Sequence, residues 1–112
     1  MNKETFGEYL RRLRTENNFT LTQLGAQLGI DSGALSKIET GKKRLDEKTL
    51  PKMAKIFKLN LTDLKDEFFS ELIAYEIYQN KCTDKVLTLA EEKVKYIKTI
   101  NTKQGTLRFT DK

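Results

Sequence analysis

Hydrophobic residues recur at intervals of three and four along most of this chain, a spacing typical of amphipathic α-helices. Two such stretches lie close together within residues 20–41. Thr20 followed by Gln23 fits the capping box that starts a helix. Gly29 can adopt the positive φ that ends a helix, and Asp31 can cap the next one. This pattern predicts two short helices joined by a tight turn.

The second of these helices is expected to have one buried and one exposed face. Leu35 and Ile38 point inward at helical spacing. The opposite face carries only small, hydroxylated or basic side chains, which are Ser32, Gly33, Ala34, Ser36 and Lys37. The major groove of DNA admits an α-helix, and Ser and Lys side chains can bond to base edges there. The pair therefore fits a helix-turn-helix motif whose second helix contacts bases, with Lys37 as the strongest candidate for a guanine contact.

Four segments resemble the DNA-binding domain of the phage-repressor (Xre/Cro) family: FGEYLRRLR, FTLTQLGAQLGI, LSKIETGKKR and TLPKMAKIFKLNLTDL. The resemblance covers roughly residues 5–64 and implies a five-helix domain that binds double-stranded DNA. It implies an ion pair between Arg14 and Glu39 that ties the first helix to the end of the third. It also implies phosphate contacts from the basic loop formed by Lys42, Lys43 and Arg44.

The resemblance further implies a phosphate contact near the start of the second helix. The family often has a polar residue, commonly glutamine, where this chain has Leu21. Thr22 and Gln23 are therefore the candidates for this contact. Of the arginines in the first helix, Arg11 and Arg12 are expected to face either solvent or phosphate.

The remaining helices of the domain follow from caps and proline. Residues 6–17 form the first helix, and Thr5 with Glu8 fits a second capping box. A fourth helix starts at Lys48 or Thr49, because a start at Asp46 would place Pro51 where it disrupts a helix. Thr62 is expected to cap a fifth helix.

The helical pattern continues beyond the point where the family domain would end. Two apolar stripes run through residues 66–78, and a further amphipathic helix starts near residues 83–84. The predicted fold is all-α: residues 1–65 form the helix-turn-helix domain, residues 66–100 a helical hairpin that extends helix 5, and residues 101–112 a polar, basic, flexible tail. A short strand at residues 106–109 is an alternative for part of the tail.

The hairpin carries more apolar surface than one partner helix covers, which is typical of a protein–protein surface. Its apolar residues are Phe68, Phe69, Leu72, Ile73, Tyr75, Ile77, Val86, Leu87, Ala90, Val94 and Ile97. The expected partner is a second copy, because twofold dimers dominate homo-oligomers, and a dimer would recognise a palindromic operator. Two alternatives are a monomer whose core the hairpin thickens and an antitoxin-type protein whose hairpin binds a different protein.

A second resemblance concerns the segment ELIAYEIYQNKCTDKVLTLAEEKVKYIK. It is similar to a tail seen on repressor-like proteins encoded beside DNA cytosine methyltransferases. This resemblance implies that the chain controls a restriction–modification system.

Charge supports a polyanionic partner. The chain has a net charge of +5, and residues 37–58 alone hold eight basic and three acidic residues. A local basic stripe beside a helix that contacts bases is typical of nucleic-acid binding, although a solvated surface without a partner is the alternative. A single cysteine, no apparent signal peptide and no apolar run of about 18 residues predict a cytoplasmic protein.

Enzyme chemistry is not expected. The chain has no histidine, so Cys82 has no histidine to activate it as a nucleophile. No cluster of side chains has the spacing of metal ligands, and no cofactor or small-molecule site is evident. Gly25, Gly29 and Gly33 do not form a phosphate loop, because no strand precedes them and no Gly-Lys-Ser/Thr follows.

Overall fold

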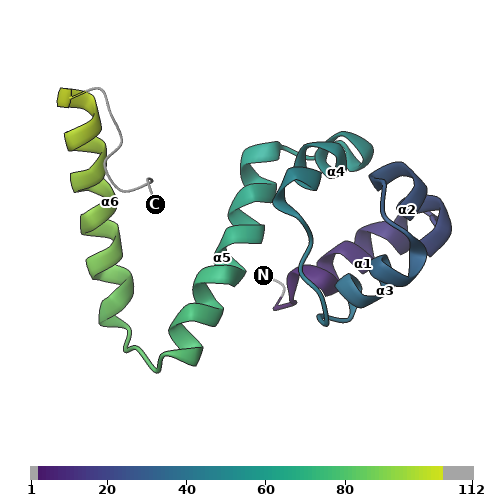
Figure 1. The fold of residues 1–112 in the computed structure, drawn as a ribbon, viewed down its shortest axis with the longest axis horizontal. Coiled ribbons are helices and arrows are strands. Elements are labelled where there is room, and N and C mark those ends of the chain that lie inside the picture. The colour runs from purple at the N-terminus through teal and green to yellow at the C-terminus, as the bar shows by residue number, and fades with distance from the viewer. Residues whose placement is uncertain (1–2, 105–112) are drawn as a thin grey trace. The chain divides into compact units, whose positions relative to one another are not determined.

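The computed structural model describes the backbone of residues 3–104 and the side chains of residues 3–101 (Figure 1). The described residues form helices and no strand, so the expected all-α class is confirmed. In chain order the elements are α1 (Phe6–Glu16), α2 (Leu21–Leu28), α3 (Ser32–Glu39), the 3-10 turn η1 (Glu47–Thr49), α4 (Leu50–Phe57), α5 (Leu61–Gln79) and α6 (Lys85–Gln104).

Side-chain caps determine where the first three helices begin. The Thr5 hydroxyl accepts from the Glu8 N–H at 3.0 Å, and the Glu8 carboxylate accepts from the Thr5 N–H at 2.9 Å. Thr20 and Gln23 make the same exchange at 3.0 and 2.9 Å. The Asp31 carboxylate accepts from a backbone N–H in the first turn of α3 at 2.8 Å. Each of these groups satisfies a backbone donor that a helix start leaves unpaired, so the predicted caps are confirmed.

The turn between α2 and α3 depends on Gly29. This residue has a φ of 76°, the left-handed conformation that glycine adopts without steric cost. The next N–H, that of Ile30, donates to the Gly25 carbonyl at 2.8 Å and closes the turn. The partly buried Ile30 side chain packs against the core.

The core lies among α1, α2, α3, α4 and the first part of α5, which are grouped together in Figure 1. Its buried hydrophobic residues are Phe6, Leu10, Leu13, Leu24, Leu28, Leu35, Ile38, Leu45, Leu50, Met53, Ala54, Phe57, Leu64 and Phe68. α1 and α3 approach so closely at Gly7 that a Cβ there would lie 2.4 Å from the Ile38 carbonyl oxygen. This close approach holds α3 against the rest of the domain.

The start of α4 confirms the interpretation of its proline. Asp46 caps the short turn η1, where its carboxylate accepts from the Lys48 N–H at 3.0 Å. α4 then begins at Leu50, one residue after the later of the two predicted starts, and Pro51 lies in its first turn. Proline is tolerated there because the first-turn N–H groups have no partner within the helix.

Two further predicted helix ends differ from the structure. α5 begins one residue before Thr62, and its cap is Asn60, whose side-chain oxygen accepts from the Asp63 N–H at 2.9 Å. Asn caps helices at least as well as Thr, so Asn60 is chemically suited to this position. α6 extends to Gln104, so the start of the expected flexible tail is helical. The alternative strand at residues 106–109 lies outside the described residues.

The described residues divide into two units after Ile73, further along the chain than the boundary expected at residue 65. Phe68 explains the longer first unit, because it is 4% exposed and packs edge to face against Phe6, with 5.3 Å between the ring centroids. Leu72 packs against the same core, and Glu71 accepts from the Phe6 N–H at 2.7 Å. Phe68 was predicted to belong to a partner surface, and this assignment is wrong because the residue is in the core.

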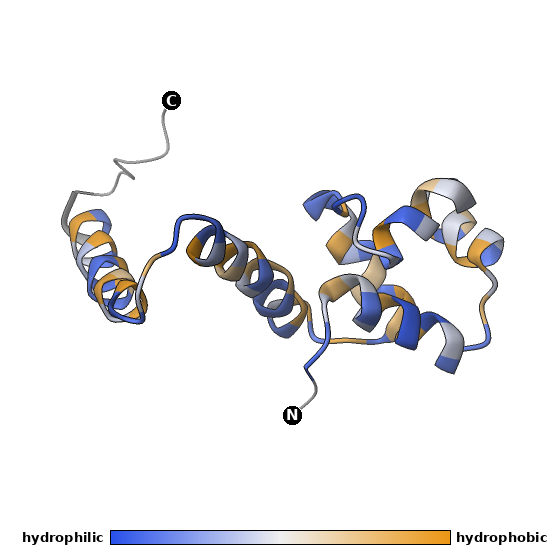
Figure 2. Ribbon diagram, turned by 90° about the horizontal axis from the view of Figure 1, so that it is seen from below, coloured by the Kyte–Doolittle hydropathy of each residue, from blue (hydrophilic) through white to orange (hydrophobic). Residues whose placement is uncertain are grey.

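The second unit contains the end of α5 and α6. No described residue of α6 is buried, and its exposed apolar side chains include Leu87, Leu89, Val94 and Tyr96. Figure 2 shows hydrophobic residues interspersed with hydrophilic ones along these helices. None of the helices in the described part of the chain is both long and apolar enough to cross a membrane.

Candidate nucleic-acid interface

The outer face of α3 is small and polar, as the sequence predicted. Ser32, Gly33 and Lys37 are exposed, whereas Ala34 and Ser36 are half-buried. On the inner face, Leu35 is fully buried and Ile38 is 5% exposed, so the helix is fixed to the core along one side. Packing therefore leaves the predicted base-contacting residues on the accessible side of a rigidly held helix.

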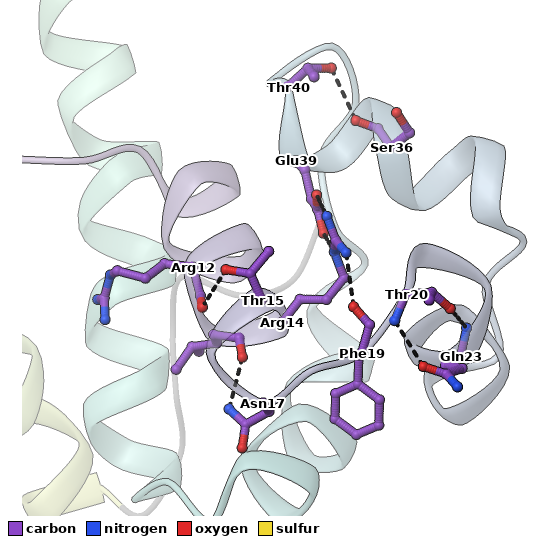
Figure 3. Close-up of polar contacts among 11 residues, drawn as sticks. Arg12, Arg14, Thr15, Asn17, Phe19, Thr20, Gln23, Ser36, Glu39 and Thr40 are labelled. Carbon is purple, nitrogen blue, oxygen red and sulfur yellow. Dashed lines mark hydrogen bonds and ion pairs between the residues drawn. The ribbon is translucent and has the colours of Figure 1, made fainter.

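An ion pair between α1 and α3 fixes the end of α3. Arg14 donates through Nε and Nη2 to the two carboxylate oxygens of Glu39, at 2.6 and 3.1 Å (Figure 3). The same guanidinium donates to the Phe19 carbonyl at 2.9 Å, in the segment that leads into α2. The Glu39 side chain is 4% exposed and that of Arg14 is 12% exposed. The expected ion pair is therefore present, and it joins all three of these segments in a buried position.

The basic loop after α3 is folded back onto the end of that helix. Lys42 and Lys43 donate their backbone N–H groups to the Lys37 carbonyl at 2.8 and 3.3 Å. The side chains of Lys42, Lys43 and Arg44 are exposed, while Leu45 is 2% exposed and anchors the loop in the core. Three cationic side chains thus extend outward from a short loop that is held at both ends.

The start of α2 carries the other predicted phosphate contacts. Thr22 and Gln23 are both exposed in the first turn of this helix. The Gln23 side-chain oxygen is engaged in the cap, which orients its side chain at the helix start. Backbone N–H groups and the helix dipole at such an end favour an anion, so this position is suited to a phosphate.

Comparison with known proteins identifies the family. Residues 10–64 match the family model described as helix-turn-helix. The chain is 36% identical over 92 residues to the HTH-type transcriptional repressor RghR of Bacillus subtilis (strain 168), covering 79% of this chain and 67% of that protein. The chain belongs to the helix-turn-helix family of transcriptional regulators. Family membership makes it a DNA-binding transcriptional regulator, for which double-stranded DNA is the ligand.

A second relative of this helix-turn-helix regulator comes from the same organism. It is the uncharacterized HTH-type transcriptional regulator RghRB, 34% identical over 93 residues, which cover 70% of this chain and 67% of that protein. Both matches span more of the chain than residues 10–64, so the similarity extends beyond the family domain. No solved structure matches the chain.

The two other arginines of α1 in this regulator, Arg11 and Arg12, have different surroundings. Arg12 pairs with Glu4 at 2.8 Å and approaches Glu16 at 3.6 Å, and its guanidinium lies 5.3 Å from the centre of the Tyr9 ring. The hydrogen bond from Arg12 lowers the pKa of the Glu4 carboxyl below its usual range. Burial, followed by the nearby Glu67 charge, raises the pKa of Tyr9. The Arg12 guanidinium is thus held by side chains of α1 and of the residues just before it, whereas the Arg11 side chain is exposed.

Glu71 and Cys82 lie outside the proposed DNA-binding surface of the regulator. Glu71, which contacts the start of α1, was not predicted, because nothing in the helical spacing of residues 66–78 distinguishes it from the other acidic residues there. Cys82 is exposed, and no group of three His, Cys, Asp or Glu side chains in the described residues is placed to hold a metal ion.

Proposed function

We propose that this chain is a sequence-specific transcriptional regulator that acts as a homodimer on a palindromic operator in double-stranded DNA. The observation that carries the proposal is the exposed face of α3, which is small, hydroxylated and basic and is fixed by the buried pair of Arg14 and Glu39. A helix held in this way can enter the major groove without rearranging the domain. Since the relative RghR is named a repressor, we propose that this chain also represses its target genes.

The proposed DNA contacts fall into two groups, one that contacts base edges and one that contacts phosphates. The exposed face of α3 contacts base edges, through Ser32, Gly33, Ala34, Ser36 and Lys37. The flanking residues contact phosphates, and these are Thr22, Gln23, Lys42, Lys43 and Arg44. Phosphate contacts position a protein on the duplex, whereas contacts with base edges select the sequence.

Two single substitutions test this division. Lys37→Ala should reduce discrimination at one base pair in each half-site, by about 1 to 3 kcal/mol, because a lysine bonds the O6 and N7 acceptors of guanine. Lys43→Ala should weaken all duplexes about equally and lower the slope of log K against log salt by about one, because one phosphate contact is lost. Affinities for the selected operator and for a mixed-sequence duplex, measured against salt, compare the two variants. Equal effects of both variants on both duplexes would contradict the division.

Support for the homodimer comes from apolar side chains that the single chain leaves accessible. Phe69 is 37% exposed, Ile73 53%, Tyr75 49%, Leu87 55% and Val94 48%. The proposed dimer surface comprises Phe69, Leu72, Ile73, Tyr75, Ile77, Val86, Leu87, Ala90, Val94 and Ile97. A twofold dimer would present two copies of α3 to successive major grooves, about 34 Å apart.

The same exposed residues favour one alternative, an antitoxin-type DNA-binding protein whose C-terminal helices bind a different protein. Both functions retain DNA binding by α3 and differ in what covers the apolar residues. The molar mass in solution distinguishes them. A stable homodimer supports the regulator, whereas a monomer or an aggregate supports a missing protein partner.

A narrower proposal concerns the genes controlled. The resemblance of residues 71–98 to tails of regulators encoded beside DNA cytosine methyltransferases leads us to propose control of a restriction–modification system. A methyltransferase gene next to the gene for this chain, with the operator in its promoter, would support this role. An operator elsewhere and no such neighbour would contradict it while leaving the DNA-binding function intact.

A further inference from the structure

A row of lysines follows one face of α4, outside the contacts assigned above. Lys52 and Lys55 are three residues apart in α4, the spacing that places helical residues on one face, and Lys48 lies in the turn η1 that leads into this helix. All three side chains are exposed. The opposite face of α4 is buried through Leu50, Met53 and Phe57, so packing directs the lysine row outward. We refer to Lys48, Lys52 and Lys55 as the α4 lysine row.

The positive charge of this row is not balanced by its surroundings. Like charges at intervals of three and four on a helix repel each other and destabilise it. α2 packs against α4 and contains no ionisable side chain. None of the ion pairs in the described part of the chain involves the row. Asp46 and Glu47 lie at its N-terminal end, and Asp31 follows the turn beside Lys52. Asp46 is engaged in capping η1 and Asp31 in capping α3. An unbalanced positive surface of this kind fits an external polyanion.

The position of Lys52 connects the row with the helix-turn-helix. Its ammonium lies beside the turn between α2 and α3, where a Cβ on Gly29 would be 3.6 Å from the Lys52 Nζ. This turn leads into the N-terminal end of α3, whereas the basic loop of Lys42, Lys43 and Arg44 follows the C-terminal end. Eight residues of α-helix span about 12 Å, so cations stand at both ends of a base-contacting helix of this length.

We propose that the α4 lysine row is a further phosphate-binding surface, in addition to the basic loop and the start of α2, and that it holds the DNA backbone at the end of α3 opposite to the basic loop. The proposal rests on the DNA-binding function proposed above and adds residues to it. Cations at both ends of α3 would restrain the helix in the groove on two sides, and the row would add charge to the neutral contacts proposed for Thr22 and Gln23. Phosphate contacts are independent of sequence, so the row would contribute to binding of any duplex.

The test compares three double variants of the full chain on one mixed-sequence duplex. Lys52→Ala/Lys55→Ala removes two charges from the row, and alanine preserves the helix because it is the strongest helix former. Lys42→Ala/Lys43→Ala removes two charges from the loop. Lys95→Ala/Lys98→Ala removes two exposed charges from α6 and serves as the control for net charge. Circular dichroism confirms that each variant is folded, and fluorescence anisotropy measures the affinity over a range of salt concentrations.

The proposal predicts that the row and loop variants each lower the slope of log K against log salt by about two per bound domain. The α6 control should leave the slope unchanged. If the loop variant lowers the slope and the row variant behaves like the α6 control, the α4 lysine row does not bind phosphate. The DNA-binding surface proposed above would remain supported. If neither lowers the slope, the DNA-binding surface proposed above is also wrong. Equal reductions by all three variants would show a general effect of net charge and would overturn the assignment to α4.

Discussion

At the scale of single residues, Arg14 and Glu39 do the most to hold α3 in place. Arg14 engages both carboxylate oxygens of Glu39 and also the Phe19 carbonyl, so one guanidinium joins α1, the start of α2 and the end of α3. Two parallel N–H donors on one carboxylate fix orientation as well as distance. Because this pair is buried, its two members depend on each other for compensation of their charges.

We predict that Glu39→Met lowers the free energy of unfolding by about 3 to 5 kcal/mol, because it leaves the Arg14 guanidinium buried without its counter-ion. The double variant Arg14→Met/Glu39→Met should lose less than this single variant, since no uncompensated charge remains. Urea denaturation measures the free energy of unfolding of the single and the double variant.

The surface pair of Glu4 and Arg12 provides the control for this prediction. Glu4→Gln removes a carboxylate that also bonds an arginine at 2.8 Å, but the side chains of this pair are 20% and 37% exposed, whereas that of Glu39 is 4% exposed. Surface pairs contribute little to stability, so the loss should be much smaller than that of Glu39→Met. Similar losses for the two variants would contradict the structural role assigned to the buried pair.

Several residue-level features could be predicted from local sequence, and others could not. The two capping boxes follow from residues three apart, and the φ of Gly29 follows from its place after a helical stripe. The pairing of Arg14 with Glu39 joins residues far apart in the chain and came from the family resemblance. The contact of Glu71 with the N–H of Phe6 depends on how α5 meets α1, which no local spacing determines.

At the scale of elements, α5 shows where helical periodicity loses its power to predict. Two apolar stripes run along this helix, one through Phe68 and Leu72 and the other through Phe69 and Ile73. Periodicity identified both stripes but not which one the domain buries. The structure buries Phe68 and leaves Phe69 37% exposed, although the centroids of the two rings are only 5.1 Å apart. The choice depends on the position of Phe6 and the rest of the core, which is a property of tertiary packing.

These adjacent phenylalanines form a matched pair for an experiment. Phe68→Ala should lower the free energy of unfolding by about 3 to 5 kcal/mol, because a large side chain is removed from a closed core. Phe69→Ala should cost the folded domain much less but weaken self-association, since this ring belongs to the proposed dimer surface. Urea denaturation and light scattering over a range of protein concentrations separate the two effects. If Phe69→Ala leaves the molar mass at every concentration unchanged, the dimer surface does not include this part of α5.

α4 shows the opposite case, in which one residue was sufficient. The restriction that Pro51 places on helix interiors predicted a late start for α4, and the helix begins at Leu50. The capped turn η1 then accommodates Asp46, which had seemed a candidate cap for α4 itself. The proline therefore correctly excluded Asp46 as the cap of α4, although the helix begins one residue later than the predicted start at Thr49.

At the scale of the whole molecule, the chain combines a helix-turn-helix domain with a C-terminal unit that has accessible apolar residues. The first unit could be predicted because α1 to α4 bury one clear stripe each within their own chain. The second unit could not be predicted in the same detail, because no described residue of α6 is buried. An isolated helix is marginally stable in water, which is consistent with the proposal that a second copy covers α6.

The most direct test of the account is selection of bound duplexes from a random DNA library by the full chain, followed by sequencing. The account predicts an inverted repeat whose half-sites are centred about one helical turn, roughly 34 Å, apart, because two copies of α3 related by a twofold axis would contact successive major grooves. A motif with one unpaired half-site would contradict the homodimer. No enriched motif at all would contradict the central claim, that α3 selects a DNA sequence.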